Sequence, residues 1–140
     1  MATRAMSRFR KGSLAIFLGL GLVSCSGDVT GPSDLQGPAW RLESMETASG
    51  TFVPADRDRF TVEFRADGTI GVIADCNQCG GAYSVDGDRL TVGPLACTLI
   101  ACPTAEGQRF AALLDGTTSV DADENELEIE SADGTLEFTR

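Results

Sequence analysis

The chain has 140 residues, enough for one ordinary domain, with five cysteines and no histidine. The missing histidine excludes Ser-His and Cys-His catalysis and every zinc site that needs imidazole. Its 21 acidic and 11 basic residues give a formal net charge of −10, which argues against nucleic acid as a partner because binding phosphates requires a basic face.

The N-terminus predicts a secretory signal peptide over residues 1–24. Four basic residues and no acidic ones precede an apolar run from Leu14 to Val23. This order of a charged region and a short apolar region is typical of a signal. The run has about half of the ~20 residues that a membrane-spanning helix needs.

The apolar run ends in Leu22-Val23-Ser24-Cys25, which resembles the lipobox of bacterial lipoproteins. The resemblance implies that the Cys25 thiol is joined to diacylglycerol, that cleavage makes Cys25 the first residue, and that its amino group is then acylated. Two or three acyl chains anchor a protein stably, whereas one is marginal. Ser26 stands where an aspartate retains enterobacterial lipoproteins at the inner membrane, so the resemblance implies a periplasm-facing protein that is free to reach the outer membrane.

Residues 25–38 predict a lipid-anchored, flexible tether. Gly, Pro, Ser and Asp dominate this segment, and it has no apolar period. Cleavage after residue 24 would leave 7 basic and 21 acidic residues, a net charge of −14. Anionic head groups repel such a surface, so the lipid would have to supply the attachment to the membrane.

Alternating apolar and polar residues predict antiparallel strands through much of the remaining chain. A period of two with one apolar face indicates a half-buried strand. The pattern occurs in four runs: 40–43, 60–65, 126–130 and 136–139. Asp-Gly pairs favour hairpin turns, and three of them lie beside predicted strands: 67–68, 86–87 and 133–134.

One segment follows a helical period instead. Pro103 opens a stretch in which Phe110, Leu113 and Leu114 fall on one face of a helix, and Gly116 follows as a candidate C-terminal cap. The sequence therefore predicts an α+β domain over residues 39–140, with a mainly antiparallel β-sheet and one short α-helix of about ten residues.

Four cysteines lie within this domain: Cys76, Cys79, Cys97 and Cys102. An even number in an exported chain indicates two disulfides, although the count leaves three pairings open. The Cys-x-x-Cys spacing also suggests a thiol-redox site, and four thiolates suggest zinc. Structural disulfides are favoured, because Gly80-Gly81 follows in a strand-like context and no helix is predicted there to lower a thiol pKa.

The cysteines belong to two short motifs. Residues 76–83 read Cys-Asn, three residues, Gly, any residue, Tyr, and residues 98–102 read Thr-x-Ile-Ala-Cys. A Trp-x-Leu start at 40–42 and a terminal Leu-x-Phe at 136–138 extend the pattern. Together they resemble the META domain family of HslJ-like bacterial envelope lipoproteins, in which methionine is usual at Ile100. The resemblance covers residues 39–140 and implies a barrel-like antiparallel sheet with one helix and no defined enzymatic activity.

The resemblance also suggests a disulfide pairing. The family motifs carry cysteine at the positions of Cys76 and Cys102, so the additional Cys79 and Cys97 suggest a second bond nested inside the first. The two spacings differ, three residues against five, so a bulge or turn has to absorb the mismatch.

The remaining motif residues are Asn77, Gly81, Tyr83 and Thr98. We interpret them as structural, with a ligand site as the alternative. Asn77 is expected to bond the backbone at a bend. Gly81 is expected to permit a close backbone approach or a positive φ. Tyr83 is expected to pack its ring in the core and to direct its hydroxyl to a partner.

The favoured function is a non-enzymatic, membrane-anchored binding or stress-tolerance module of the cell envelope. It is expected to be a monomer with no cofactor, catalytic residue or metal, whose partner is an unknown envelope protein or small ligand. The alternative is a thiol-redox or metal-handling protein that uses Cys76 and Cys79. A third hypothesis is a calcium-responsive module at the acidic run 121–130, although a solvated strand face is favoured because EF-hand spacing is missing.

Overall fold

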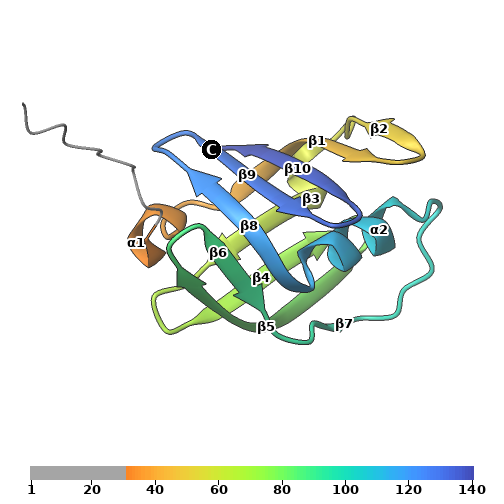
Figure 1. Cartoon of the computed structure of the whole chain (residues 1–140). Helices are drawn as coiled ribbons and strands as arrows, with labels where there is room; N and C mark the ends of the chain where they lie inside the picture. Colours follow the sequence, from red (N-terminus) through yellow and green to blue (C-terminus); the bar gives the residue numbers. More distant parts are fainter. Residues whose placement is uncertain (1–30) are drawn as a thin grey trace, which may run out of the picture.

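The computed structural model describes residues 31–140, so the predicted signal peptide, the predicted lipid site Cys25 and residues 26–30 lie outside the described residues. Figure 1 shows strands wrapped around a common interior, with a helix at each end. No helix within residues 31–140 is long and apolar enough to cross a membrane. The elements in chain order are α1 (Pro32–Leu35), β1 (Trp40–Thr47), β2 (Gly50–Phe52), η1 (Arg57–Arg59), β3 (Phe60–Phe64), β4 (Thr69–Ala74), β5 (Asn77–Asp86), β6 (Arg89–Val92), β7 (Ala96–Cys97), α2 (Glu106–Leu114), β8 (Gly116–Ala122), β9 (Glu126–Ser131) and β10 (Gly134–Thr139).

Eight antiparallel strands close into a barrel in the order β1-β3-β4-β5-β6-β8-β9-β10. The pairing of β10 with β1, from Arg41 opposite Thr139 to Thr47 opposite Gly134, completes the circuit. Closure removes the free edges that an open sheet would expose. Two short strands lie off the circuit: β2 pairs with β1, and β7 pairs with β5. The predicted fold class, a barrel-like antiparallel sheet with one short helix and two disulfides, is confirmed.

Apolar side chains fill the barrel interior. In β3 the residues predicted to face inward, Phe60, Val62 and Phe64, are at most 5% exposed, and Thr61 and Glu63 between them are half-buried. The period of two therefore places one face of β3 in the core, where a fully buried large side chain contributes about 1.5–3 kcal/mol. Phe110 of α2 reaches the same core, with its ring centroid 5.7 Å from Phe60 and 6.0 Å from Phe138.

The glycines of the three predicted hairpins are needed for two different reasons. Gly68 and Gly87 turn the chain with φ of +82° and +61°, which a residue with a side chain rarely adopts. Gly134 has no such φ, but a Cβ there would lie 2.2 Å from the Glu46 carbonyl oxygen. In the first hairpin the Thr69 hydroxyl and the Thr69 backbone N–H both donate to Asp67 Oδ1, which holds the Asp67 pKa below its ordinary value of 3.8.

The predicted helix closes one end of the barrel. It begins at Glu106, later than Pro103, and ends at Leu114, just before Gly116, whose φ is +90°. Gly107 lets the helix approach the end of β4 closely, because a Cβ at this position would lie 2.5 Å from the Ala74 carbonyl oxygen. The α2 backbone is thus seated directly on the turn between β4 and β5.

Residues 31–38 close the other end, and the prediction of a flexible tether through residue 38 is wrong for this segment. Leu35 is 0% exposed, and its carbonyl accepts a 2.8 Å hydrogen bond from the Trp40 indole N–H. The Arg140 guanidinium lies 4.0 Å from the Trp40 ring centroid and donates to the Gln36 carbonyl at 2.9 Å. The Gly- and Pro-rich composition concealed one apolar side chain that packs against the core. The folded domain therefore begins before residue 39.

Candidate functional site

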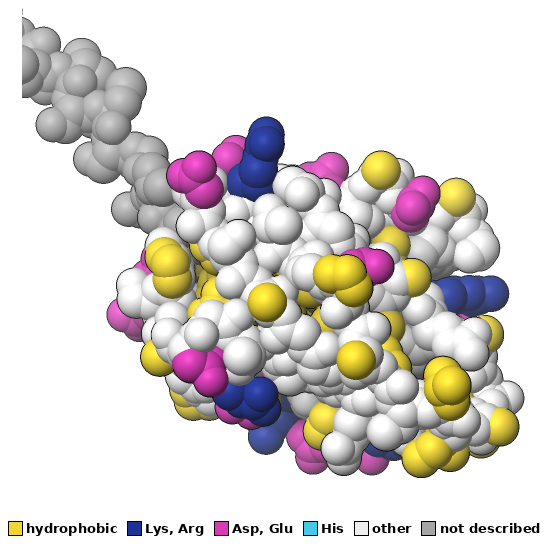
Figure 2. All heavy atoms as spheres, turned by 90° about the horizontal axis from the view of Figure 1, so that it is seen from below, with side chains coloured by type: hydrophobic (Ala, Val, Ile, Leu, Met, Phe, Trp, Pro, Cys, Tyr) yellow, Lys and Arg dark blue, Asp and Glu magenta, His cyan; other side chains and the backbone are white. Residues whose placement is uncertain are grey.

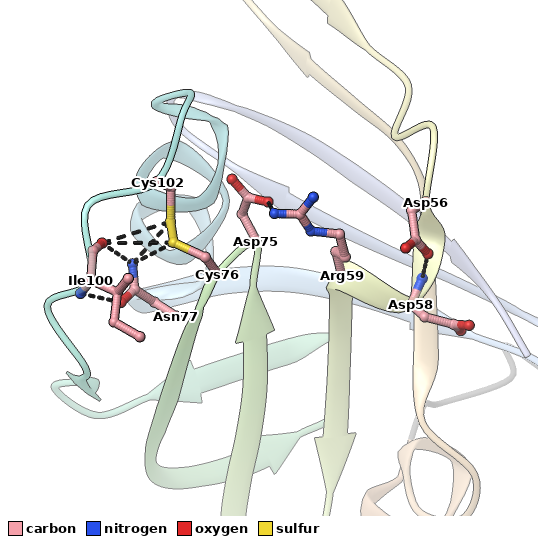
Figure 3. A network of polar contacts seen from close by, with 8 residues as sticks. All are labelled: Asp56, Asp58, Arg59, Asp75, Cys76, Asn77, Ile100 and Cys102. Carbon is pink, nitrogen blue, oxygen red and sulfur yellow. Dashed lines mark hydrogen bonds and ion pairs between the residues drawn. A yellow bond between two sulfur atoms is a disulfide. The ribbon is translucent and has the colours of Figure 1, made fainter.

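Two disulfides join β5 to the segment that precedes α2. Cys76 is bonded to Cys102, with 5.7 Å between Cα atoms, and Cys79 is bonded to Cys97, with 4.0 Å. This is the nested pairing expected from the family resemblance. Both bonds lie near the end of the barrel that α2 covers, and Figure 3 shows the first of them.

An ion pair between the buried carboxylate of Asp75 and the half-exposed side chain of Arg59 supports the turn that carries Cys76. Asp75 has a φ of +60°, and its side chain is 7% exposed. Its carboxylate lies 2.5 Å from a terminal nitrogen of Arg59, and its backbone N–H donates to the Arg59 carbonyl at 2.7 Å (Figure 3). Asp75 and Arg59 thus fix the end of β4 and the start of β5. Sequence reasoning missed this pair, because neither residue belongs to a recognisable motif.

The side chain of Asn77 organises the loop from Thr98 to Cys102. Its Oδ1 accepts the Ile100 backbone N–H at 2.8 Å and the Thr98 hydroxyl at 2.9 Å. Its Nδ2 donates to the Ile100 carbonyl at 3.0 Å (Figure 3). This is the backbone-bonding role expected for Asn77. The loop also absorbs the unequal cysteine spacing, because the chain leaves the β5–β7 ladder at Thr98 and wraps around Asn77 before it reaches Cys102.

Gly81 faces a β-bulge. Tyr83 pairs with Val92 of β6, and Gly80 pairs with Ala96 of β7. The chain therefore advances four residues from Val92 to Ala96 where β5 advances three, which is one extra residue. A Cβ on Gly81 would lie 3.2 Å from Leu95 Cδ2 and 3.3 Å from the Pro94 carbonyl oxygen. Gly81 therefore permits a close approach of two backbones, which is one of the two roles expected for it.

Tyr83 and Trp40 belong to the opposite end of the barrel. The Tyr83 ring lies edge-on to Phe64 with 5.0 Å between centroids. Its hydroxyl donates to the Arg65 carbonyl at 2.8 Å and accepts from Gln36 Nε2 at 3.1 Å. The structure thus brings Asn77 and Thr98 together with the four cysteines, and it places Tyr83 at the other end of the fold.

A cleft of about 250 Å³ opens between the disulfide-bonded loop and α2; we call it the mouth cleft. Its walls are Ala74, Asn77 and Cys79 of the sheet, residues 97–101 of the loop, and Gly107, Gln108 and Ala111 of α2. Two large apolar side chains of this loop remain in solvent: Leu99 is 97% exposed and Ile100 is 59% exposed. Solvent-exposed apolar side chains beside a cavity are the usual mark of a binding surface.

The residues that line the mouth cleft carry no charged side chain. No Asp, Glu, Lys or Arg occurs in residues 76–85 or 90–105, although 23% of the whole chain is charged. Figure 2, a view from below Figure 1, shows a surface of mostly uncharged groups, with charged side chains at its margin and a few within it. The sequence carried this signal in the two uncharged runs, but an interpretation based on motifs did not use it and therefore missed Leu99. Gln108 and Ala111 lie outside these runs, and no sequence signal marked them.

The thiol-redox alternative does not match this geometry. The two cysteines of the Cys-x-x-Cys motif are bonded to different partners, and Cys79 is 7% exposed. A thioredoxin-like site needs an accessible cysteine with a lowered pKa, and Cys76 precedes a strand here. Among residues 31–140, no three His, Cys, Asp or Glu side chains are grouped closely enough to hold a metal ion.

The acidic run at 121–130 forms a turn and one strand face. Asp123 Oδ1 accepts the backbone N–H groups of Asn125 and Glu126, at 2.8 and 2.9 Å, which holds the Asp123 pKa below its ordinary value of 3.8. The glutamates at 126, 128 and 130 alternate outward along β9 and are exposed. They form the solvated strand face that the sequence favoured over a calcium site.

The described residues form a small, disulfide-bridged β-barrel whose α2 end carries an uncharged, apolar cleft. A family model of the META domain matches residues 33–140, and the chain belongs to this family. The start of the match agrees with the packing of residues 31–38 against the barrel. No curated protein matches the sequence.

Solved structures show the same fold at low sequence identity. An NMR structure of a protein from Burkholderia xenovorans is 20% identical with a TM-score of 0.60, and the alignment covers 96% of this chain and 98% of that one. A lipocalin-like protein from Bacteroides uniformis is 18% identical with a TM-score of 0.55, over 76% of this chain and 98% of that one. A DUF4847 family protein from Bacteroides vulgatus is 15% identical with a TM-score of 0.56, over 75% and 93%.

Proposed function

We propose that this chain is a lipid-anchored, non-enzymatic META-domain protein of the cell envelope that binds a partner and supports the envelope under stress. The observation that carries the proposal is the mouth cleft, with Leu99 and Ile100 exposed beside it. Burying such side chains on a partner is favourable by roughly 25 cal/mol per Å² of apolar surface. In the unbound barrel these two side chains stay in water, so this gain is available only when a partner covers them.

The polar groups around the cleft support binding over catalysis. Asn77 and Thr98 bond each other and the loop backbone, so they hold the wall in place and are not free to transfer a proton. A catalytic nucleophile is commonly activated by an adjacent general base. Among the described lining residues, the remaining polar side chain is the amide of Gln108, which is not a base.

The proposed location in the envelope rests on the N-terminal sequence and on the disulfides. The lipobox-like Leu22-Val23-Ser24-Cys25 supports lipid attachment at Cys25. The two disulfide bonds support an exported protein, because such bonds persist in oxidising compartments. We therefore propose a periplasm-facing monomer that is held by its lipid to the membrane, with the outer membrane permitted by Ser26.

Mass spectrometry of the protein extracted from the membrane fraction tests the anchor. The mature chain should begin at Cys25, carry two or three acyl chains there, and contain both disulfides. A Cys25→Ser variant should leave the membrane fraction. A strain that expresses this variant in place of the wild type should survive envelope stress as poorly as a deletion strain. An unmodified Cys25 on a membrane-bound protein, or full rescue by Cys25→Ser, would contradict the proposal.

A further inference from the structure

The outer side of β7 is a strand edge without a strand partner among residues 31–140. β7 pairs with β5 alone, at Cys79 opposite Cys97 and Gly80 opposite Ala96. The 4.0 Å separation of the two cysteine Cα atoms is typical of a pair that does not exchange backbone hydrogen bonds. The backbone N–H and C=O of Cys97 therefore point away from β5, toward the outer edge.

This edge lacks protection by charge. Proteins commonly shield an exposed strand edge with charged side chains, especially lysine, with proline, or by keeping the edge strand very short, and β7 has two residues. The run 90–105 around β7 is uncharged, and Pro94 lies two residues before the strand begins. Leu99, at 97% exposure, lies two residues after the end of β7, and the mouth cleft lies beside it. The edge thus offers one backbone donor and one acceptor, both of Cys97, next to an apolar cavity.

The membrane is a poor occupant for this edge. Five residues separate Cys25 from Gly31, whose N–H bonds the Asp34 side chain at the start of α1. Six Cα–Cα steps span at most about 22 Å, so a lipid on Cys25 would hold the α1 end close to the bilayer. In Figure 1 α1 lies at the left of the barrel, whereas β7 and the loop after it lie at the right. The edge then faces away from the anchoring membrane.

We propose that β7 and the mouth cleft bind an extended, uncharged segment of a partner protein, which adds to the barrel as a strand along β7. In this mode backbone hydrogen bonds supply affinity and alternate side chains enter pockets. The cleft volume of about 250 Å³ lies below the ~300–1,000 Å³ of pockets for drug-sized ligands, so it fits apolar side chains of such a strand. The uncharged wall offers no ion-pair partner to a charged segment. This inference rests on the proposed binding function and names its partner class.

Fluorescence anisotropy with a defined peptide tests the proposal. The protein is the full mature chain on phosphatidylcholine vesicles, and the probe is a blocked, dye-labelled Ser-Val-Thr-Val-Ser peptide. Two further peptides carry N-methyl groups, on the two valines or on the threonine and serines, so that each loses the donors of one strand edge. We expect saturable binding of the probe, and at least a tenfold loss of affinity for one methylated peptide but not for the other.

Matched variants locate the binding. Leu99→Asp places a charge beside the edge and should weaken binding at least tenfold without changing the melting temperature. Val53→Asp changes another exposed apolar residue, 66% exposed and outside the cleft, and should leave binding unchanged. Equal binding of both methylated peptides, equal effects of the two variants, or no binding at all would overturn the proposal. A doubled mass of the free protein that Leu99→Asp abolishes would also overturn it, because β7 would then pair with a second copy.

Anchoring is measured separately, by flotation of the protein with the vesicles. A protein that floats but does not bind the probe disproves the strand addition and leaves the lipid anchor intact. A protein that stays in solution disproves the anchor, and its peptide binding is then measured on the same full mature chain without vesicles.

Discussion

The two ends of the barrel hold the chain that covers them in place by different interactions. At the α1 end, Leu35 and Trp40 are buried, and Arg140 covers the Trp40 ring and bonds the chain beside it. At the α2 end, the loop keeps Leu99 and Ile100 in solvent. A loop that buries few side chains gains little order from the hydrophobic effect. There, two disulfides and Asn77 hold the chain in place.

This difference teaches how a small domain presents an apolar surface without collapsing around it. Packing stabilises one end, and covalent bonds that restrict the unfolded chain stabilise the other. The binding surface can then remain exposed at little cost to the stability of the fold. Substitutions at the two ends should therefore affect different properties. At the α1 end they should lower the stability by a large amount, and at the exposed tip of the loop they should weaken binding alone.

The largest effect is expected for Trp40→Ala. Removing a fully buried tryptophan from a core costs about 3–5 kcal/mol, and the Leu35 carbonyl also loses its indole donor. Urea unfolding measures the loss. Leu99→Ala is the matched control at the other end, and it should change the free energy of unfolding by less than about 0.5 kcal/mol. Comparable losses for the two variants would remove the distinction between the ends.

The second-largest loss of stability is expected when a disulfide is removed. Each bond closes a loop, with sequence separations of 26 for Cys76–Cys102 and 18 for Cys79–Cys97. The chain-entropy relation gives about 3 kcal/mol for either loop. The double variant Cys76→Ala/Cys102→Ala should therefore lower the free energy of unfolding by about that amount, as measured by urea unfolding. An unchanged unfolding midpoint would show that packing, and not the covalent bond, holds the α2 end.

A smaller loss is expected where α2 sits on the sheet. Gly107→Ala places a Cβ 2.5 Å from the Ala74 carbonyl oxygen, so helix or turn has to shift. Such overpacking costs typically about 1–3 kcal/mol. Gly80→Ala is the matched control, because its Cβ would meet ordinary contact at 3.7 Å from the Ile70 carbonyl. Calorimetry should show a lower melting temperature for Gly107→Ala than for Gly80→Ala; the reverse order would contradict the seating of α2.

The smallest effect concerns Asp67. Hydrogen bonds from Thr69 hold the native pKa of Asp67 below 3.8, its ordinary value, so the ionised carboxylate favours the folded state. This contribution is present above pH 3.8 and is lost as the pH falls through the lower native pKa. NMR titration of the Asp67 carboxyl carbon should give a value below 3.8, which Thr69→Ala should raise. An ordinary value in the wild-type protein would contradict the turn geometry.

Periodicity predicted most of the fold because the same residues that alternate in sequence face the core. Phe60, Val62 and Phe64 are an example, and Phe110 and Leu114 of the helix are another. The domain boundary escaped prediction, since one buried Leu35 within a Gly- and Pro-rich segment gives no period. The candidate site was predicted in part. The motifs located Asn77 and the cysteines, but α2 contributes to the cleft through Gln108 and Ala111, which only the folded chain brings near the loop.

Hydrogen–deuterium exchange, followed by mass spectrometry with and without the Ser-Val-Thr-Val-Ser peptide, tests the contrast between the two ends most directly. Without peptide, the strands beside α1 should exchange slowly. The Cys97 backbone N–H, which points away from β5, should exchange fast, whereas the Thr98 N–H, which bonds the Gln78 carbonyl, should be protected. With peptide, protection should increase at residues 95–99 and along α2, and the α1 end should be unchanged. Protection that appears at the α1 end, or a Cys97 N–H that is already protected without peptide, would contradict the assignment of the α2 end as the binding end.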